Sequence, residues 1–240
     1  MEQTVHLLAI DLKSASAAVR DAFAMSRNEL ASLSSKARAA GEDIEVVVLA
    51  SDERFEIYTT ESARQAAYRA VLGGIVNRMP SEERASVRTT EVIGVAAAWH
   101  LMQLMTGTEG QSGVRMLGAV KHAVVLARAS GTLGSELAAL FDCATNAGWR
   151  IQSETTLGDG QSSRAEREVD RFEAERIIEE ELVTWQAARA SQGSVQSIPA
   201  SRLDPSYYAA AEPGSSIRLR APHLSNVVRF AKPAPRRGVA

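Results

Sequence analysis

The chain has 240 residues, of which 45% are hydrophobic and 23% charged, as is usual for a soluble globular domain with an appendage. The single cysteine, Cys143, excludes an internal disulfide and a cysteine-ligated zinc site, and the net charge of −2 argues against a general polyanion binder. Because there is no apolar run of about 18 residues and no secretory leader, we expect a cytoplasmic protein with no membrane partner.

The first part of the chain predicts strands interleaved with helices. Residues 5–10 form a buried apolar run typical of a strand, and two helical segments follow it at 15–26 and 28–40. Residues 45–50 are rich in β-branched side chains, and residues 54–60 alternate between apolar and polar. The short SDE segment between these two strands predicts a tight hairpin turn.

The middle of the chain predicts one more strand and then only helices. A helix is expected at about 61–78 and a strand at 86–94. Three helices then follow at about 95–106, 114–130 and 133–150, with Gly131 and Gly148 as breaks in the pattern. The pattern predicts an α+β fold in which helices pack on a small sheet.

A Gly/Ser linker at 157–163 leads to a long predicted helix at 164–191. Val169, Phe172, Leu182 and Trp185 are expected to share one apolar face, which needs the body or a second copy of the chain to pack on. Residues 192–240 predict an irregular tail. Its last forty residues carry a charge of +5, which suits either RNA phosphates or a solubilising end.

Three stretches, in order and with similar spacing, resemble the glutamyl-tRNA reductase family. LASDERFEIY at 49–58 is similar to the family pattern L-S-T-C-N-R-T-E-I-Y. HLMQLMTG at 100–107 and LGAVKHAVVLARASGTLGSELAALF at 117–141 resemble H-L-x-x-V-x-x-G and G-Q-V-K-x-A-x-x-x-A-x-x-x-G-T-x-G-x-x-L-x-x-L-F. AGWRIQSET at 147–155 is similar to G-K-x-V-R-x-E-T. The resemblance implies an N-terminal catalytic domain at 1–156, and a helix at 164–191 that begins a dimerisation region and makes a homodimer.

The sequence also departs from the family pattern. The family's catalytic cysteine falls on Asp52, and a carboxylate cannot form the family's thioester with the aminoacyl group. Only TLGDGQSS lies between Thr155 and Arg164, with no strand and no G-x-G-x-x-G turn for a dinucleotide. We therefore expect no hydride transfer from NADPH, no cofactor and no metal ion. Cys143 lies in a predicted helix and is expected to be a packing residue.

The resemblance assigns roles to several residues, each with a plainer alternative. Arg54 matches the arginine that binds the carboxylate of the glutamyl side chain, or it pairs with Glu53 or Glu56 in the hairpin. His100 matches the active-site histidine and acts as a general base or on a carbonyl oxygen, or it is structural. The remaining candidates are Ser51 and Glu56 for substrate binding and Arg115 and Lys121 for tRNA binding.

Asp52 suggests a change of chemistry. Its carboxylate could activate a hydroxyl or amine that attacks the aminoacyl ester of a charged tRNA, with glutamyl-tRNA the first candidate and a small molecule the acceptor. Alternatively, Asp52 only fills a turn. Two other functions stay open: a non-catalytic paralogue that binds tRNA or regulates tetrapyrrole synthesis, and a binder of a small metabolite or haem through His6, His100, His122 or His223.

Overall fold

The computed structural model describes residues 4–39, 44–84, 87–107, 113–155, 157 and 164–192. Apart from Leu157 and Gln192, the predicted linker at 157–163 and the predicted tail at 192–240 lie outside these described residues.

The sheet has four antiparallel strands in the order β2-β3-β1-β4. Their bounds are β1 Val5–Asp11, β2 Val46–Ala50, β3 Arg54–Thr60 and β4 Thr89–Ile93. The predicted hairpin joins β2 to β3, with Ala50 opposite Phe55. The backbone N–H of Ser51 donates to the carbonyl of Arg54 at 2.9 Å and closes the turn. Asp11, at the end of β1, lies opposite Arg54.

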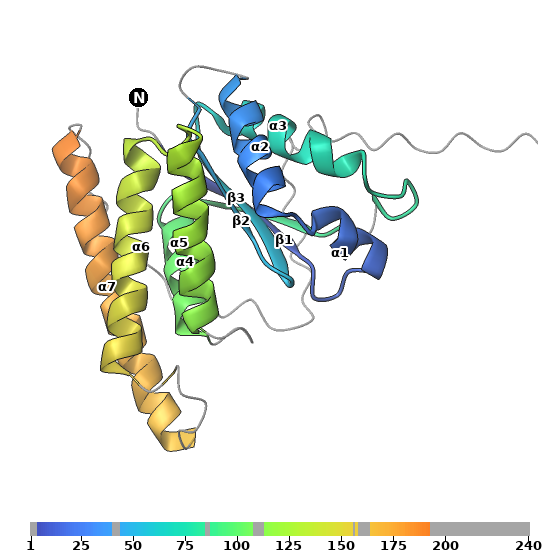
Figure 1. Cartoon of the computed structure of the whole chain (residues 1–240). Coiled ribbons are helices and arrows are strands. Elements are labelled where there is room, and N and C mark those ends of the chain that lie inside the picture. Colours follow the sequence, from blue (N-terminus) through green and yellow to red (C-terminus); the bar gives the residue numbers. More distant parts are fainter. Residues whose placement is uncertain are drawn as a thin grey trace, which may run out of the picture.

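Helices cover both faces of this sheet (Figure 1), which gives two separate apolar cores. On one face, α1 (Ala17–Phe23), α2 (Arg27–Ala39) and α3 (Arg64–Val76) enclose side chains such as Leu8 and Ile57. On the other face, side chains such as Leu7 and Tyr58 meet α4 (Val95–Gln103), α5 (Gly113–Ala129), α6 (Ser135–Glu154) and α7 (Arg164–Gln192). Because successive strand residues point to opposite faces, β1, β2 and β3 each supply both cores, whereas β4 adds only Val92 to the second. The predicted α+β class is confirmed.

Several helix ends differ from the predicted ones for local reasons. Helix α1 starts after Ser16, whose Oγ accepts a hydrogen bond from the backbone N–H of Val19 at 3.3 Å and caps the helix. Helix α4 gives way to a 3₁₀ turn, η2, at Leu104–Thr106, and this turn ends at Gly107 in the left-handed region with φ 71°.

The start of α6 explains the G-T-x-G stretch of the sequence. Gly131 has φ 67°, in the left-handed region that favours glycine. A Cβ on Gly134 would lie only 2.1 Å from the carboxylate of Glu45. That carboxylate accepts a hydrogen bond at 3.0 Å from the backbone N–H of Leu137, so Glu45, from the segment before β2, caps the first turn of α6.

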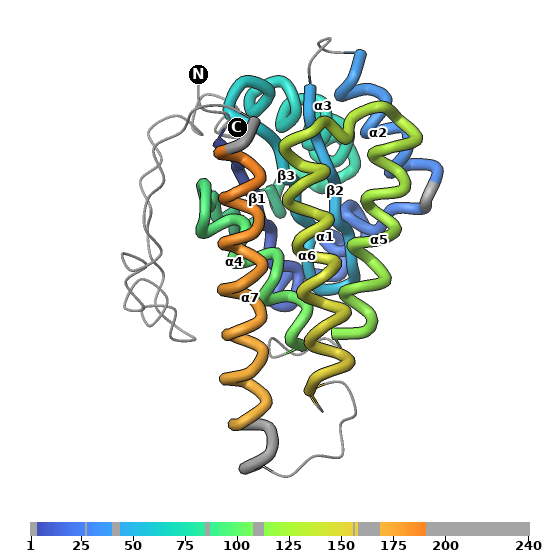
Figure 2. Tube along the Cα trace, turned by 90° about the vertical axis from the view of Figure 1, so that its left-hand side faces the viewer, coloured from blue at the N-terminus to red at the C-terminus, as the bar shows by residue number. Residues whose placement is uncertain are grey.

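Helix α7 packs on α4 and α6, side by side with α6 (Figure 2). Its buried apolar side chains are Ala174, Ile177, Ile178, Leu182 and Trp185. The predicted apolar face is therefore wrong for Val169 and Phe172, which are 69% and 70% exposed. At about 100° per residue these two lie on the side of the helix opposite Trp185. Since the chain's own body covers the buried face, a homodimer through 164–191 stays a prediction.

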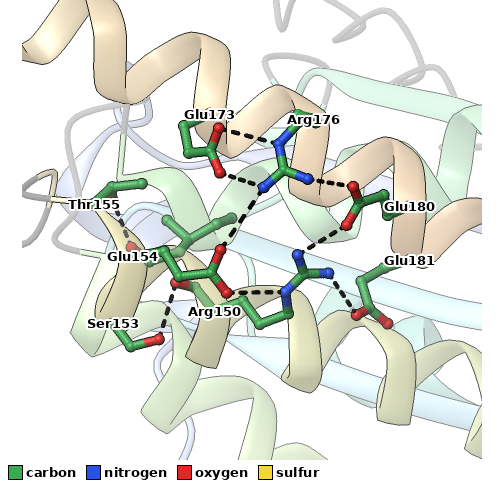
Figure 3. A network of polar contacts seen from close by, with 9 residues as sticks. Arg150, Ser153, Glu154, Thr155, Glu173, Arg176, Glu180 and Glu181 are labelled. Atoms are coloured by element: carbon green, nitrogen blue, oxygen red, sulfur yellow. Dashed lines mark hydrogen bonds and ion pairs between the residues drawn. The ribbon is translucent and has the colours of Figure 1, made fainter.

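Ion pairs line the α6–α7 contact (Figure 3). The Arg150 guanidinium lies 2.8 Å from Glu180, 3.1 Å from Glu154 and 3.3 Å from Glu181. Arg176 pairs with Glu173 and Glu180 beside it (Figure 3). One arginine of α6 thus contacts two carboxylates of the acidic α7. Of the helices in the described part of the chain, none has the length and apolar character needed to cross a membrane.

Candidate functional site

The centre of the candidate site is the carboxylate of Glu56, which is 1% exposed on strand β3. His100 Nε2 on α4 lies 2.9 Å from Glu56 Oε1. The Tyr58 hydroxyl donates to Oε2 at 2.8 Å, and Arg54 Nη1 donates to Oε1 at 3.4 Å. Glu56 and Tyr58 are two residues apart on one strand and so point to the same face, towards α4. Three side chains thus converge on one buried carboxylate.

The charge state of Glu56 follows from these contacts. Burial raises the pKa of Glu56. The positive charges of His100 and Arg54 and the hydrogen bonds from His100 and Tyr58 together lower this pKa by more than burial raises it. The result is a pKa below the ordinary value of 4.5. An ionised carboxylate only accepts hydrogen bonds, so His100 donates through Nε2. Glu56 therefore fixes which imidazole nitrogen carries the hydrogen in this contact.

A hollow of about 220 Å³ opens beside this cluster, and we call it the Glu56 hollow. Its polar lining comes from the ends of β1 and β3 and from α4 and includes Asp11, Lys13, Arg54, Glu56 and His100. Lys13 also pairs with Glu53 at 3.4 Å across the rim. Arg54 makes the predicted contact with Glu56, one of the two hairpin pairings, and it also lines the hollow. The structure therefore brings Arg54, Glu56 and His100 together.

Asp52 and Ser51 lie elsewhere. Both line a second hollow of about 460 Å³, the Asp52 hollow, whose wall includes Arg20, Phe23 and Met25 from α1 and the segment after it. This hollow is on the α1 side of the sheet, whereas the Glu56 hollow is on the α4 side. The exposed Asp52 side chain sits in the turn that separates the two hollows. Asp52 is thus close in sequence to the cluster but outside its hollow.

The two candidate tRNA contacts lie outside both hollows, on α5. Arg115 is exposed near the start of the helix. Lys121 lies two turns further along, with its Nζ atom 3.9 Å from the centre of the Trp149 ring on α6. This cation–π contact was not anticipated, because it joins two helices.

Cys143 and His6 are buried away from the Glu56 hollow. Cys143 is buried in α6, and burial together with the nearby Glu181 and Asp142 raises its pKa to about 11. A thiol held protonated in this way is a poor nucleophile, which agrees with the packing role expected for it. His6, one of the candidate haem ligands, is buried on the other side of the sheet, in ion pairs with Glu61 and Glu91.

The sequence reasoning missed Tyr58 and Trp149. Tyr58 belongs to the EIY stretch, and its two-residue spacing from Glu56 on a strand was the available signal. Trp149 had no such signal. A tryptophan in a helix is expected in the core unless the exposed side of that helix is known. It is 53% exposed.

Comparison with known proteins shows the family of this chain. Residues 8–155 match the family model described as glutamyl-tRNAGlu reductase, N-terminal domain. The chain therefore belongs to the glutamyl-tRNA reductase family, by its N-terminal domain. The match includes Asp52, Arg54, Glu56 and His100.

Curated relatives extend well beyond the matched part. A glutamyl-tRNA reductase of Rhodospirillum rubrum is 30% identical over 151 residues, covering 62% of this chain and 35% of the relative. Glutamyl-tRNA reductase 2 of a Nocardioides species is 31% identical over 157 residues, covering 63% and 34%. A solved glutamyl-tRNA reductase from Methanopyrus kandleri is 25% identical, with a TM-score of 0.48, covering 65% of this chain and 35% of that one. The chain thus spans about a third of the length of these relatives.

Proposed function

We propose that this protein binds the aminoacyl end of a charged tRNA, with glutamyl-tRNA the first candidate, and transfers the aminoacyl group to a small hydroxyl or amine acceptor. The observation that carries the proposal is the Glu56 hollow, where Arg54, Glu56 and His100 meet in a chain with aspartate at the family's cysteine position. An aspartate can assist a nucleophile but does not form a thioester.

In this proposal the Glu56 hollow receives the acyl group. Arg54 offers a guanidinium fork to a side-chain carboxylate, the geometry that favours bidentate binding. Glu56 is a positioning residue. Its Oε1 accepts hydrogen bonds from Arg54 Nη1 at 3.4 Å and from His100 Nε2 at 2.9 Å and so holds both side chains in place. His100 stands at the edge of the hollow, where its imidazolium form can donate from Nδ1 to the ester carbonyl while Nε2 donates to Glu56. A hollow of about 220 Å³ suits an amino acid rather than a large ligand.

The transfer step assigns a role to Asp52. The acceptor's oxygen or nitrogen forms a bond to the acyl carbon, and the bond from that carbon to the ribose oxygen breaks. Asp52 accepts the proton that the acceptor loses, and the departing ribose oxygen takes a proton back. No oxidant or reductant is consumed, and the products are an ester or amide and uncharged tRNA. This role requires the acceptor to enter from the Asp52 hollow and meet the ester at the turn.

A second candidate function has its own support. Asp52 is exposed and lies outside the Glu56 hollow, which favours a non-catalytic relative that binds charged tRNA, or that regulates tetrapyrrole synthesis, without acting on the ester. In that case Arg54, Glu56 and His100 only recognise the aminoacyl group and do not react with it.

One experiment separates the two. The protein is mixed with radiolabelled glutamyl-tRNA and a pool of small amines and alcohols, and acyl release and product mass are followed. We expect transfer in the parent, loss of transfer with retained tRNA binding in Asp52→Asn, and weaker binding in Arg54→Lys. Glu29→Gln is the matched control, because Glu29 is an exposed carboxylate on α2 that lines neither hollow.

Binding of charged over uncharged tRNA without any product, in the parent and in Asp52→Asn alike, would select the second candidate. No preference for charged tRNA in any variant would contradict the transfer function and also a second candidate that acts by binding charged tRNA.

A further inference from the structure

Helix α5 has an unusual charge for this chain. Its residues include Arg115, Lys121 and Arg128 but no aspartate or glutamate, although the whole chain has a net charge of −2. No carboxylate of the described residues forms an ion pair with any of these three cations. Positive potential without compensating acid is the electrostatic feature that attracts nucleic-acid phosphates.

The exposed side of α5 also carries two valines and a glycine in one row with Lys121. Val114, Gly118, Lys121 and Val125 are spaced by four, three and four residues, so they form one row along the helix. Both valines are exposed, and a Cβ on Gly118 would meet nothing within 4 Å. The row therefore has an open stretch of backbone in the middle, beside Lys121.

Trp149 lies at the edge of this row. It comes from α6, which runs beside α5 (Figure 2), and its ring is 53% exposed with Lys121 over it. An exposed indole next to a lysine combines a surface on which a base can stack with a charge for the neighbouring phosphate. This is the arrangement by which single-stranded nucleic acids are held without sequence readout.

The start of α5 follows closely on α4, the helix of His100. Helix α5 begins against Met105 and Gly107, at the end of the 3₁₀ turn that follows α4. Lys121 lies eight residues further along α5, about 12 Å from its first residue at 1.5 Å per residue. A strand that follows α5 over this length needs only a few extended nucleotides.

We propose that the α5–α6 surface, defined by Val114, Arg115, Gly118, Lys121, Val125 and Trp149, binds the unpaired nucleotides next to the aminoacylated end of the tRNA. One base stacks on Trp149, while Lys121 and Arg115 contact phosphates. The inference rests on the proposed function for the identity of the RNA, but the surface binds RNA through bases and phosphates whether or not the tRNA is charged.

The test measures binding of uncharged glutamate tRNA and of the same tRNA charged with glutamate, by fluorescence anisotropy at several salt concentrations. Trp149→Ala should weaken both affinities roughly 10-fold, whereas Trp149→Phe keeps a stacking ring and should retain most of the affinity. Lys121→Ala and Arg115→Ala should each reduce the salt slope by about 1. Phe172→Ala, which removes an even more exposed aromatic ring from the acidic α7, should change nothing.

The outcomes separate the two proposals. Equal weakening of charged and uncharged tRNA in Trp149→Ala supports the surface even when the parent shows no preference for charged tRNA, a result that would contradict the proposed function alone. If the parent prefers charged tRNA and the affinity is unchanged in both Trp149→Ala and Lys121→Ala, the α5–α6 surface does not bind tRNA. A protein partner would then be the occupant of this surface. Melting temperatures check that the variants fold, and Lys121→Ala, at a half-buried lysine, repeats the test without loss of a ring.

Discussion

The imidazole of His100 lies 2.9 Å from the carboxylate of Glu56, although 44 residues separate them in the sequence. This contact joins α4 to β3 through a polar pair inside an otherwise apolar interface, next to Tyr58 and Phe141, whose rings meet edge to face. A buried carboxylate is stable there only because three partners satisfy it. The candidate site and the packing of the core therefore depend on the same residue.

Replacing Glu56 by glutamine should destabilise the protein. The amide keeps the shape but removes the charge that His100 and Arg54 contact, and it turns one acceptor into a donor. We expect a loss of about 2–4 kcal/mol in the free energy of unfolding by urea. Glu53→Gln removes a partly exposed carboxylate whose partner Lys13 is 43% exposed, so its cost should stay below about 1 kcal/mol. Equal costs in the two variants would contradict the central role of Glu56.

The lowered pKa of Glu56 predicts how this stabilisation depends on pH. A carboxyl whose pKa is lower in the folded state than in the unfolded state stabilises the fold above the unfolded value, near 4.5, and loses that contribution as pH falls through the folded value. The difference in unfolding free energy between parent and Glu56→Gln should therefore be constant at neutral pH and shrink below about pH 4.5. A difference that grows as the pH falls would have the wrong sign.

The sequence predicted most of the fold but not the division of the site. Strand periods and the hairpin residues identified all four strands, because these signals are local. Asp52 and Arg54 are two residues apart and would share a face on a regular strand. The strand is interrupted at Ser51–Glu53, however, and the turn directs Asp52 to the α1 side and Arg54 to the α4 side. The geometry of a turn is not contained in its residue spacing.

Helix α7 illustrates a second limit. Its length and acidity were evident from composition, but its apolar residues fall on two sides, and only the docking surface selects one of them. Ala174 and Glu181 became buried because they flank Ile177, Ile178 and Trp185, while Phe172 did not. The acidic residues that receive Arg150 could not be identified without knowing that α6 lies alongside.

The docking of α7 can be measured through Trp185, which is fully buried against the body. Trp185→Ala should cost about 3–5 kcal/mol, because it leaves a large cavity between α7 and its neighbours. Phe172→Ala on the opposite side of the same helix should change the stability by less than about 0.5 kcal/mol. If the two variants lost similar amounts of unfolding free energy, and did so only at high protein concentration, copies of the chain would instead associate through the exposed side of α7.

Cys143 should resist alkylation in the folded protein. Burial raises its pKa to about 11, so little thiolate is present at pH 8, and the side chain is enclosed by α6 and its neighbours. Iodoacetamide should label it much more slowly than in urea, as followed by mass spectrometry. Fast labelling of the native protein, at the rate seen in urea, would show that the thiol is accessible and would reopen a chemical role for it.

Two glycine substitutions test the account of the α6 start. In Gly134→Ala the new methyl group overlaps the Glu45 carboxylate at 2.1 Å, so Glu45 must move away from the Leu137 N–H and the helix loses its cap. We expect a loss of about 1–2 kcal/mol in the free energy of unfolding. Gly73→Ala is the matched control, because Gly73 lies inside α3 with nothing within 4 Å of a new Cβ. There alanine favours the helix and should stabilise the protein by about 0.5–1 kcal/mol. If both substitutions shift the urea midpoint in the same direction, the capping role of Glu45 is wrong.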